Sequence, residues 1–181
     1  VAGFKVDFMD RDDQKVVQFY YRLAQTATKH KLMLDLHGAY KPTGMQRTYP
    51  NILNFEGVHG LENTKWSNPD FPQYDCTVPF IRMLAGPMDY TPGIFEIKMS
   101  KYDPKKTEQV QTTLAKQLAL YVTLYSPFQM AADFPENYAP RMDAFQFSRD
   151  VAVDWDDTRI LEAEPGDYVT IARKAKGKDE W

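Results

Sequence analysis

Short apolar runs alternate with a helical pattern over the first third of the chain. Residues 1–8, 32–36 and 52–55 are each apolar and short, which is typical of buried parallel strands. Between the first two runs, apolar residues recur at helical spacing as far as Lys31 and predict one amphipathic helix. The acidic residues just before this helix favour its first turn. The alternation of strand and helix predicts parallel β/α units.

Weaker signals of the same kind continue along the chain. In order, the pattern predicts a loop at 66–75, a short helical or extended stretch at 77–84, a strand end passing into a turn at 86–93, a helix over 107–124, a short strand at 128–132 and a helix near 137–150. These segments bring the strand candidates to about five, which falls short of the eight of a closed barrel.

The last part of the chain departs from this alternation. Residues 158–163 and 168–173 read as strands, and the Glu-Pro-Gly-Asp sequence between them predicts an antiparallel hairpin. Half of a (β/α)8 barrel followed by the start of a β-sandwich fits the pattern, with the boundary near residue 155. A complete open α/β sheet is the alternative.

Composition removes several classes of protein. The chain has 181 residues, of which 43% are hydrophobic, so a single globular unit can bury a substantial core. A net charge of −3 with scattered cations argues against a nucleic-acid partner. Cys76 stands alone, so the chain holds no disulfide, and no apolar run is long enough for insertion into a membrane. Both ends are abrupt, so a fragment of a longer protein is expected.

Polar residues follow the predicted strands, and in parallel α/β folds such positions gather around one opening. They are Lys5, Asp7, His37, Glu56, His59, Glu62 and Asp89. Alternation along the first strand puts Lys5 and Asp7 on one face, where the lysine would keep the carboxylate ionised, as a nucleophile requires. A buried structural ion pair is the other interpretation of these two residues.

Two glutamates lie six positions apart, with glycines between them that loosen the backbone. Glu56 and Glu62 are close enough for one to bind a hard cation such as Ca²⁺ and the other to donate a proton. Surface-loop glutamates are the plainer alternative. A His-bound zinc site is disfavoured because no HxH or HExxH spacing exists, so His37 and His59 suit hydrogen bonds to sugar hydroxyls better.

Several phrases together resemble glycoside hydrolase family 97. They are KVDFMDRDDQ, HGAYKPTGMQRTYPN, NFEGVHGLE, AGPMDYTPG, KQLALYVTLYSPFQMAADFPENY and YVTIARKAK. The resemblance implies that residues 1–155 are the C-terminal half of the catalytic (β/α)8 TIM barrel, from about strand 4 to strand 8. Residues 156–181 would then begin the antiparallel C-terminal β-domain.

The resemblance also implies roles for individual residues. Inverting members carry a His-Glu-Ala phrase with a glutamate base, whereas this chain has His-Gly-Ala at 37–39. The pattern is therefore similar to the retaining branch, which implies Asp7 as nucleophile, Glu62 as general acid/base and Glu56 as a calcium ligand. The residues expected to bind substrate lie in the same phrases, and they are Lys5, His37, Arg47, His59 and Asp89.

The function implied is a retaining exo-α-galactosidase that acts on oligosaccharides with calcium as cofactor, in the periplasm or secreted. An α-glucosidase of the same family is the alternative, and a non-catalytic carbohydrate-binding module is the rival from another class. Half a barrel leaves open sheet edges, so the isolated chain is expected to be inactive and to self-associate.

Overall fold

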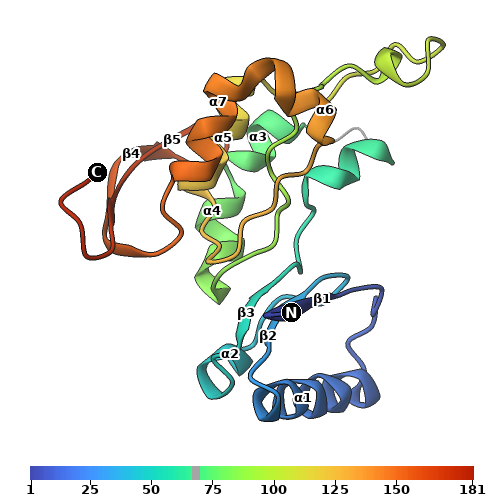
Figure 1. The fold of residues 1–181 in the computed structure, drawn as a ribbon, viewed down its shortest axis with the longest axis vertical. Helices are drawn as coiled ribbons and strands as arrows, with labels where there is room; N and C mark the ends of the chain where they lie inside the picture. The colour runs from blue at the N-terminus through green and yellow to red at the C-terminus, as the bar shows by residue number, and fades with distance from the viewer. Residues whose placement is uncertain (67–69) are drawn as a thin grey trace.

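A three-stranded parallel sheet forms the N-terminal part of the fold (Figure 1). The computed structural model describes residues 1–66 and 70–181. Its strands are β1 (Gly3–Val6), β2 (Met33–Leu36) and β3 (Ile52–Phe55), in the order β1-β2-β3. The three strands predicted from the apolar runs are confirmed, and their carboxyl ends lie together at one edge of the sheet.

Helix α1 (Gln14–Lys29) covers one face of this sheet. It begins where predicted because the Asp13 carboxylate caps it, accepting hydrogen bonds from the backbone N–H groups of Lys15 and Val16. Its buried face packs against the strands in a single core cluster, which contains Tyr20, Ala24 and Ala27 from the helix and Leu34, Leu36, Ile52 and Phe55 from the sheet. The short helix α2 (Met45–Thr48) precedes β3.

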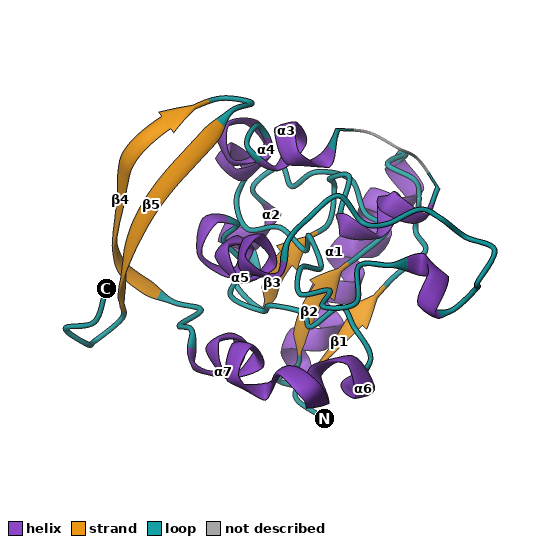
Figure 2. Cartoon of the chain, turned by 90° about the horizontal axis from the view of Figure 1, so that it is seen from above, coloured by secondary structure: helices purple, strands orange, loops and turns teal. Residues whose placement is uncertain are grey.

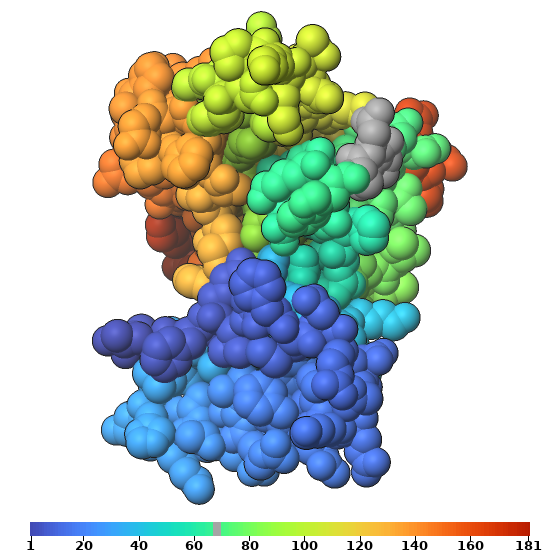
Figure 3. Space-filling view, turned by 90° about the vertical axis from the view of Figure 1, so that its right-hand side faces the viewer, coloured from blue at the N-terminus to red at the C-terminus, as the bar shows by residue number. Residues whose placement is uncertain are grey.

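Short helices and long loops make up the second part of the fold, which lies beyond the end of β3 (Figure 1). They are η1 (Leu61–Lys65), α3 (Phe71–Asp75), α4 (Val78–Ile81), η2 (Arg82–Ala85), η3 (Met99–Lys101), α5 (Leu114–Thr123), α6 (Pro135–Tyr138), η4 (Ala139–Arg141) and α7 (Met142–Asp150). A second core cluster holds this part together, with Leu61, Val78, Met88, Tyr90 and Leu120 among its members. Figure 3 shows the N-terminal part, in blue, below these later segments.

The helix predicted over 107–124 is shorter than expected. It begins only after Thr113, whose hydroxyl caps the helix by accepting from the N–H of Lys116. The residues before it are extended, because the Val110 N–H donates to the Ile97 carbonyl and Lys98 bridges to Gln109. The N-cap hydrogen bond at Thr113 therefore sets the start of the helix, although the apolar residues before it continue the helical spacing.

Strand signals in the second part were also overestimated. The stretch 86–93 contributes one isolated parallel bridge, between Met88 and Phe55, which continues the sheet past β3. No strand forms at 128–132, where the backbone instead bonds to side chains such as the Tyr121 hydroxyl. Within the expected loop at 66–75, α3 forms a helix, and residues 67–69 lie outside the described part of the chain. A run of apolar residues this short does not distinguish a strand from a packed loop.

A long antiparallel hairpin ends the chain and lies to one side of the rest (Figure 2). It consists of β4 (Trp155–Glu164) and β5 (Tyr168–Ala175), both longer than predicted, with the turn in the predicted place. Large apolar side chains on it, including Ile160 and Leu161, are exposed. In the described part of the chain, no helix has the length and apolarity needed to span a bilayer. The observed fold is therefore α/β with a C-terminal two-stranded antiparallel sheet.

Candidate active site

A cavity of about 510 Å³ opens at the carboxyl ends of β1 and β2. Its volume falls in the range of small-ligand sites, about 300–1,000 Å³. Lys5 and Asp7 reach it from the end of β1, and His37 reaches it from the end of β2. Glu62, on the 3-10 helix η1, lines the same cavity. The two carboxylates expected to act on a sugar therefore share one cavity.

Asp7 is held in place by the backbone that follows it. Its Oδ1 accepts a hydrogen bond of 2.6 Å from the N–H of Phe8, a residue with φ of +63°. Gly38 lies directly against this turn: a Cβ at that position would stand 2.9 Å from the Asp7 Oδ1 and 2.8 Å from the Phe8 nitrogen. Glycine at 38, with φ of +56°, therefore allows the ends of β1 and β2 to approach this closely.

Lys5 neutralises a different carboxylate from the one expected. Its Nζ lies 2.7 Å from the Asp89 Oδ2 and 3.9 Å from the Asp35 Oδ2. Among residues 1–66 and 70–181, no cation pairs with the Asp7 carboxylate within 4.0 Å. The prediction that Lys5 keeps Asp7 ionised by direct pairing is thus wrong, because the buried carboxylates of Asp35, on β2, and Asp89, which follows the Met88 bridge, attract the ammonium instead.

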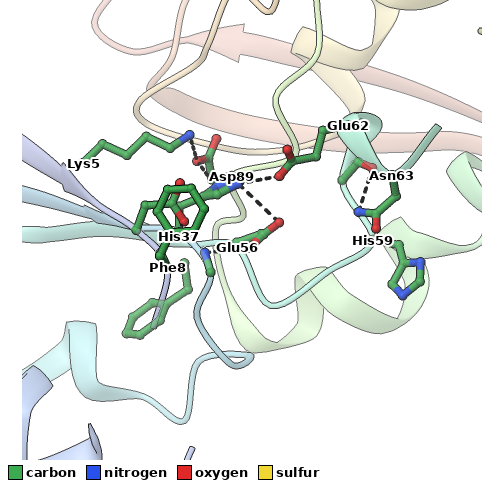
Figure 4. Close-up of polar contacts among 12 residues, drawn as sticks. Lys5, Phe8, His37, Glu56, His59, Glu62, Asn63 and Asp89 are labelled. Carbon is green, nitrogen blue, oxygen red and sulfur yellow. Dashed lines mark hydrogen bonds and ion pairs between the residues drawn. The ribbon is translucent and has the colours of Figure 1, made fainter. Parts of the chain in front are cut away.

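His37 connects three acidic residues (Figure 4). Its Nδ1 lies 2.7 Å from the Asp89 Oδ2, and its Nε2 lies 2.9 Å from the Glu62 Oε1 and 3.3 Å from the Glu56 Oε1. Burial lowers the pKa of the imidazole, but hydrogen bonds to Asp89 and Glu62 outweigh burial and raise the pKa to about 9. At neutral pH the ring is therefore an imidazolium that donates from both nitrogens.

Glu56 lies beside this imidazolium and is tied to the backbone of the neighbouring strand end. Its Oε2 accepts a 2.8 Å hydrogen bond from the Gly38 N–H, and burial raises the pKa of its carboxyl. Ligand atoms of His37, Glu56 and Glu62 lie within 4.8 Å of one another. The carboxylate oxygens suit Ca²⁺, whereas the imidazole does not, and Ca²⁺ takes about 6–8 oxygen ligands. The Glu56 carboxylate thus has the donor chemistry that a hard cation needs.

Asp35 belongs to this cluster, although it was read only as part of a buried strand. It is 2% exposed and lies opposite Lys5 in the β1–β2 register. Burial, together with the adjacent Asp89 carboxylate, raises the pKa of Asp35 to about 8. Burial would also raise the pKa of Asp89, but hydrogen bonds from His37 and Lys5 hold it below its ordinary value. A charge inside the apolar run Met-Leu-Asp-Leu was the signal available in the sequence.

In the full-length protein, the stability of Asp35→Asn relative to the wild type is expected to increase as the pH rises. The pKa of Asp35 is about 8 in the folded state and its ordinary value is 3.8. At a pH between these two values the folded state therefore keeps a proton that the unfolded state has lost. Wild-type stability therefore falls with rising pH across that window, by at most about 1.4 kcal/mol per pH unit from this group. Asparagine cannot ionise. Thermal unfolding midpoints of both proteins from pH 5 to 9 test this, and parallel curves would contradict it.

Arg82, which was not predicted from the sequence, links the end of β3 to the segment that precedes Asp89. It is 6% exposed, and its guanidinium donates to the carbonyls of Phe55 and Glu56 on one side and of Gly86 and Pro87 on the other. Burial lowers its pKa to about 10. The guanidinium thus fixes the backbone of Glu56 relative to the segment that leads to Asp89. The sequence offered no signal beyond a charge in an apolar stretch.

Three residues expected to bind substrate do not line the cavity. Arg47 lies on α2, which carries the chain back toward the amino end of β3, and it lines a separate hollow. His59 is exposed, with its ring 6.4 Å from that of Tyr74, and Figure 4 shows it away from the cluster. Asp89 is buried and contacts Lys5 and His37, so it acts on the cavity through them.

Both ends of the chain match known family models. Residues 1–58 match the model described as Glycoside hydrolase 97, and residues 154–181 match the model described as Glycosyl-hydrolase 97 C-terminal, oligomerisation. The chain is 49% identical to a protein of Bacteroides thetaiotaomicron named retaining alpha-galactosidase, and 34% identical to a probable retaining alpha-galactosidase of Streptomyces bingchenggensis. These alignments cover 100% and 98% of the chain but only 28% and 26% of the relatives.

Solved structures resemble the chain over nearly its whole length. A glycoside hydrolase family 97 enzyme from Pseudoalteromonas sp. strain K8, solved with panose, is 44% identical with a TM-score of 0.81, over 94% of this chain and 26% of that one. The same enzyme was solved with acarbose. A beta-arabinopyranosidase is 32% identical with a TM-score of 0.85, over 97% of this chain and 28% of that one.

Proposed function

Because this chain belongs to glycoside hydrolase family 97, we propose that its full-length protein is a retaining exo-α-glycosidase that removes terminal α-linked galactose. The observation that carries the proposal is that Asp7 and Glu62 line one cavity of suitable size. The names of two relatives, one a retaining alpha-galactosidase and one a probable one, support galactose as the sugar.

The proposed reaction is a double displacement. Asp7 attacks the anomeric carbon while Glu62 protonates the oxygen of the leaving group, which gives a covalent glycosyl-enzyme. Glu62 then takes a proton from water, which hydrolyses the intermediate with net retention. The imidazolium of His37, hydrogen-bonded to Glu62, holds that carboxyl in position, and the Phe8 N–H does the same for Asp7.

Gly38 supports retention over inversion. An inverting enzyme needs a carboxylate base that activates water, with carboxyl groups about 6.5–9.5 Å apart, whereas a retaining pair stands about 5–5.5 Å apart. Position 38 carries no side chain, and a Cβ there would crowd the Asp7 carboxylate. A base at 38 and a nucleophile at 7 are therefore incompatible in this backbone.

Calcium is proposed as the cofactor, with Glu56 as a ligand and further oxygen ligands from parts of the protein outside this chain. The carboxylate character of the cluster fits a hard cation. When bound, the ion would supply positive charge that orients substrate hydroxyls and holds the neighbouring carboxylates in place. We also propose that the full-length protein is secreted or exported to the periplasm.

The three-stranded sheet and the bridge at Met88 are proposed to be the second half of a closed (β/α)8 barrel in the full-length protein. The 181-residue chain alone is then expected to hydrolyse nothing and to self-associate, because β1 is an unpaired edge beside the cavity. Size-exclusion chromatography with an aryl-glycoside assay tests this, and hydrolysis by a monomeric chain would contradict it.

The function itself is tested on the full-length protein with paired nitrophenyl α-galactoside and α-glucoside. Faster release of nitrophenol from the galactoside is expected, with the first sugar product being the α-anomer by NMR. An α-glucosidase is the second candidate, favoured by the similar enzyme solved with panose and acarbose, and it predicts the opposite ratio. Sugar binding without hydrolysis would contradict both enzyme hypotheses and support a non-catalytic carbohydrate-binding module.

A further inference from the structure

An aromatic pair lies at the edge of the cavity, on elements distant in sequence from the catalytic carboxylates. Tyr102 follows η3 and Phe134 precedes α6, and both line the cavity that holds Asp7 and Glu62. Their ring centroids are 6.0 Å apart in an edge-to-face arrangement, with 50% and 61% of the residues exposed. Each ring thus presents a large apolar area to the cavity mouth.

A buried polar network holds Tyr102 in one orientation. The side-chain amide of Asn137, a residue that is 5% exposed, donates 2.5 Å hydrogen bonds to the Tyr102 hydroxyl and to the Asp133 Oδ1. Lys101 donates to the Asn137 carbonyl oxygen. Both amide hydrogens and the amide oxygen of Asn137 therefore make hydrogen bonds. Tyr102 is positioned by its hydroxyl's bond to this buried amide rather than by burial of its own ring.

The same network also positions Phe134. Asp133 accepts from the backbone N–H of Phe134 at 2.8 Å with Oδ1, and from the N–H groups of Phe95 and Glu96 at 2.7 Å with Oδ2. One carboxylate thus fixes the segment before α6 against the segment before η3. The Tyr102 hydroxyl and the backbone that carries Phe134 are thus both anchored, so two exposed rings stand on fixed supports and form an apolar platform at the cavity.

The platform lies on the side of the proposed proton donor. Thr64 and Lys65, on the same 3-10 helix as Glu62, share a neighbouring hollow of about 150 Å³ with Met99 and Val110. The element carrying Glu62 therefore lies against the segment that leads to Tyr102. The leaving-group oxygen must meet Glu62, so a leaving-group sugar would lie in the cavity that Glu62 and these rings both line.

We propose that Tyr102 and Phe134 form the subsite for the leaving-group sugar, the residue to which the terminal α-linked sugar is attached. The apolar C–H face of a pyranose packs on an aromatic ring, and this contact buries apolar area on both partners. The subsite rests on the proposed hydrolase function and extends it from the bond that is cut to the acceptor side of the substrate.

The test compares two substrates of the full-length protein that differ only in the leaving group: an α-galactosyl disaccharide and α-galactosyl fluoride, which has no leaving sugar. Tyr102→Ala is expected to lower kcat/KM on the disaccharide by about tenfold or more, with the fluoride unaffected. Phe134→Ala should follow the same pattern, and Tyr102→Phe, which keeps the ring, should lose less. Tyr168→Ala, an exposed tyrosine on β5 outside the cavity, is the matched control.

Unchanged activity on the fluoride also reports that each variant is folded. Equal losses of activity on both substrates would overturn the proposed subsite. No loss on the disaccharide would also overturn it, and this result is expected if another part of the full-length protein covers the rings. A wild-type protein that cleaves neither substrate, nor the matching α-glucosyl pair, would instead remove the proposed function itself.

Discussion

Asp7→Ala in the full-length protein is expected to abolish hydrolysis of an aryl α-galactoside, with a loss of at least about 10³-fold, the scale seen when a nucleophilic group is removed. The reason is that the double displacement cannot begin without a nucleophile at the end of β1. Glu62 and the contacts of His37 are untouched by this substitution, so leaving-group protonation remains available.

Added azide is expected to restore part of the activity of Asp7→Ala. The small anion fits the space that the carboxylate vacates and attacks the anomeric carbon from that side, opposite the leaving group. The product is therefore β-galactosyl azide, which NMR identifies by its anomeric proton. Asp12→Ala, an exposed acidic residue a few positions later, should retain wild-type activity. Retained hydrolysis by Asp7→Ala, without azide rescue, would remove Asp7 from the role.

The second large effect is expected from Gly38→Ala. The added Cβ would stand 2.8 Å from the Phe8 nitrogen and 2.9 Å from the Asp7 Oδ1, and both distances are shorter than real Cβ contacts allow. The turn that holds Asp7 must therefore move. Since a misplacement of about 1 Å can cost about 10²-fold in rate, we expect a loss of that order in kcat/KM.

A matched glycine separates crowding from backbone strain. Gly44 also has a positive φ, +97°, but nothing lies within 4 Å of a Cβ built there. Gly44→Ala therefore carries a conformational cost of about 1–2 kcal/mol without displacing any site residue, and its kcat/KM should match the wild type. Wild-type kcat/KM in Gly38→Ala would show that the close approach of the two strand ends is not needed for catalysis.

The sequence alone determined the elements whose signals are local. The apolar runs of β1, β2 and β3 and the helical stripe of α1 were predicted because side-chain periodicity is set by residues adjacent in the chain. The hairpin was predicted for the same reason, since its turn residues impose their own backbone geometry. The short strand at 128–132 was misjudged, and the strand end at 86–93 amounts to one bridge at Met88, because apolar residues also occur in packed loops.

Only the tertiary structure decided which charges meet. Lys5 and Asp89 lie 84 positions apart, yet the ammonium pairs with Asp89 rather than with Asp7 two residues away. The protonation of His37 and the raised pKa of Asp35 depend likewise on carboxylates delivered by other strands and loops. Phrases in the sequence selected Asp7 and Glu62 as candidates. The cavity they share, and the exclusion of Arg47 and His59 from it, follow from strand order and loop paths that no local pattern encodes.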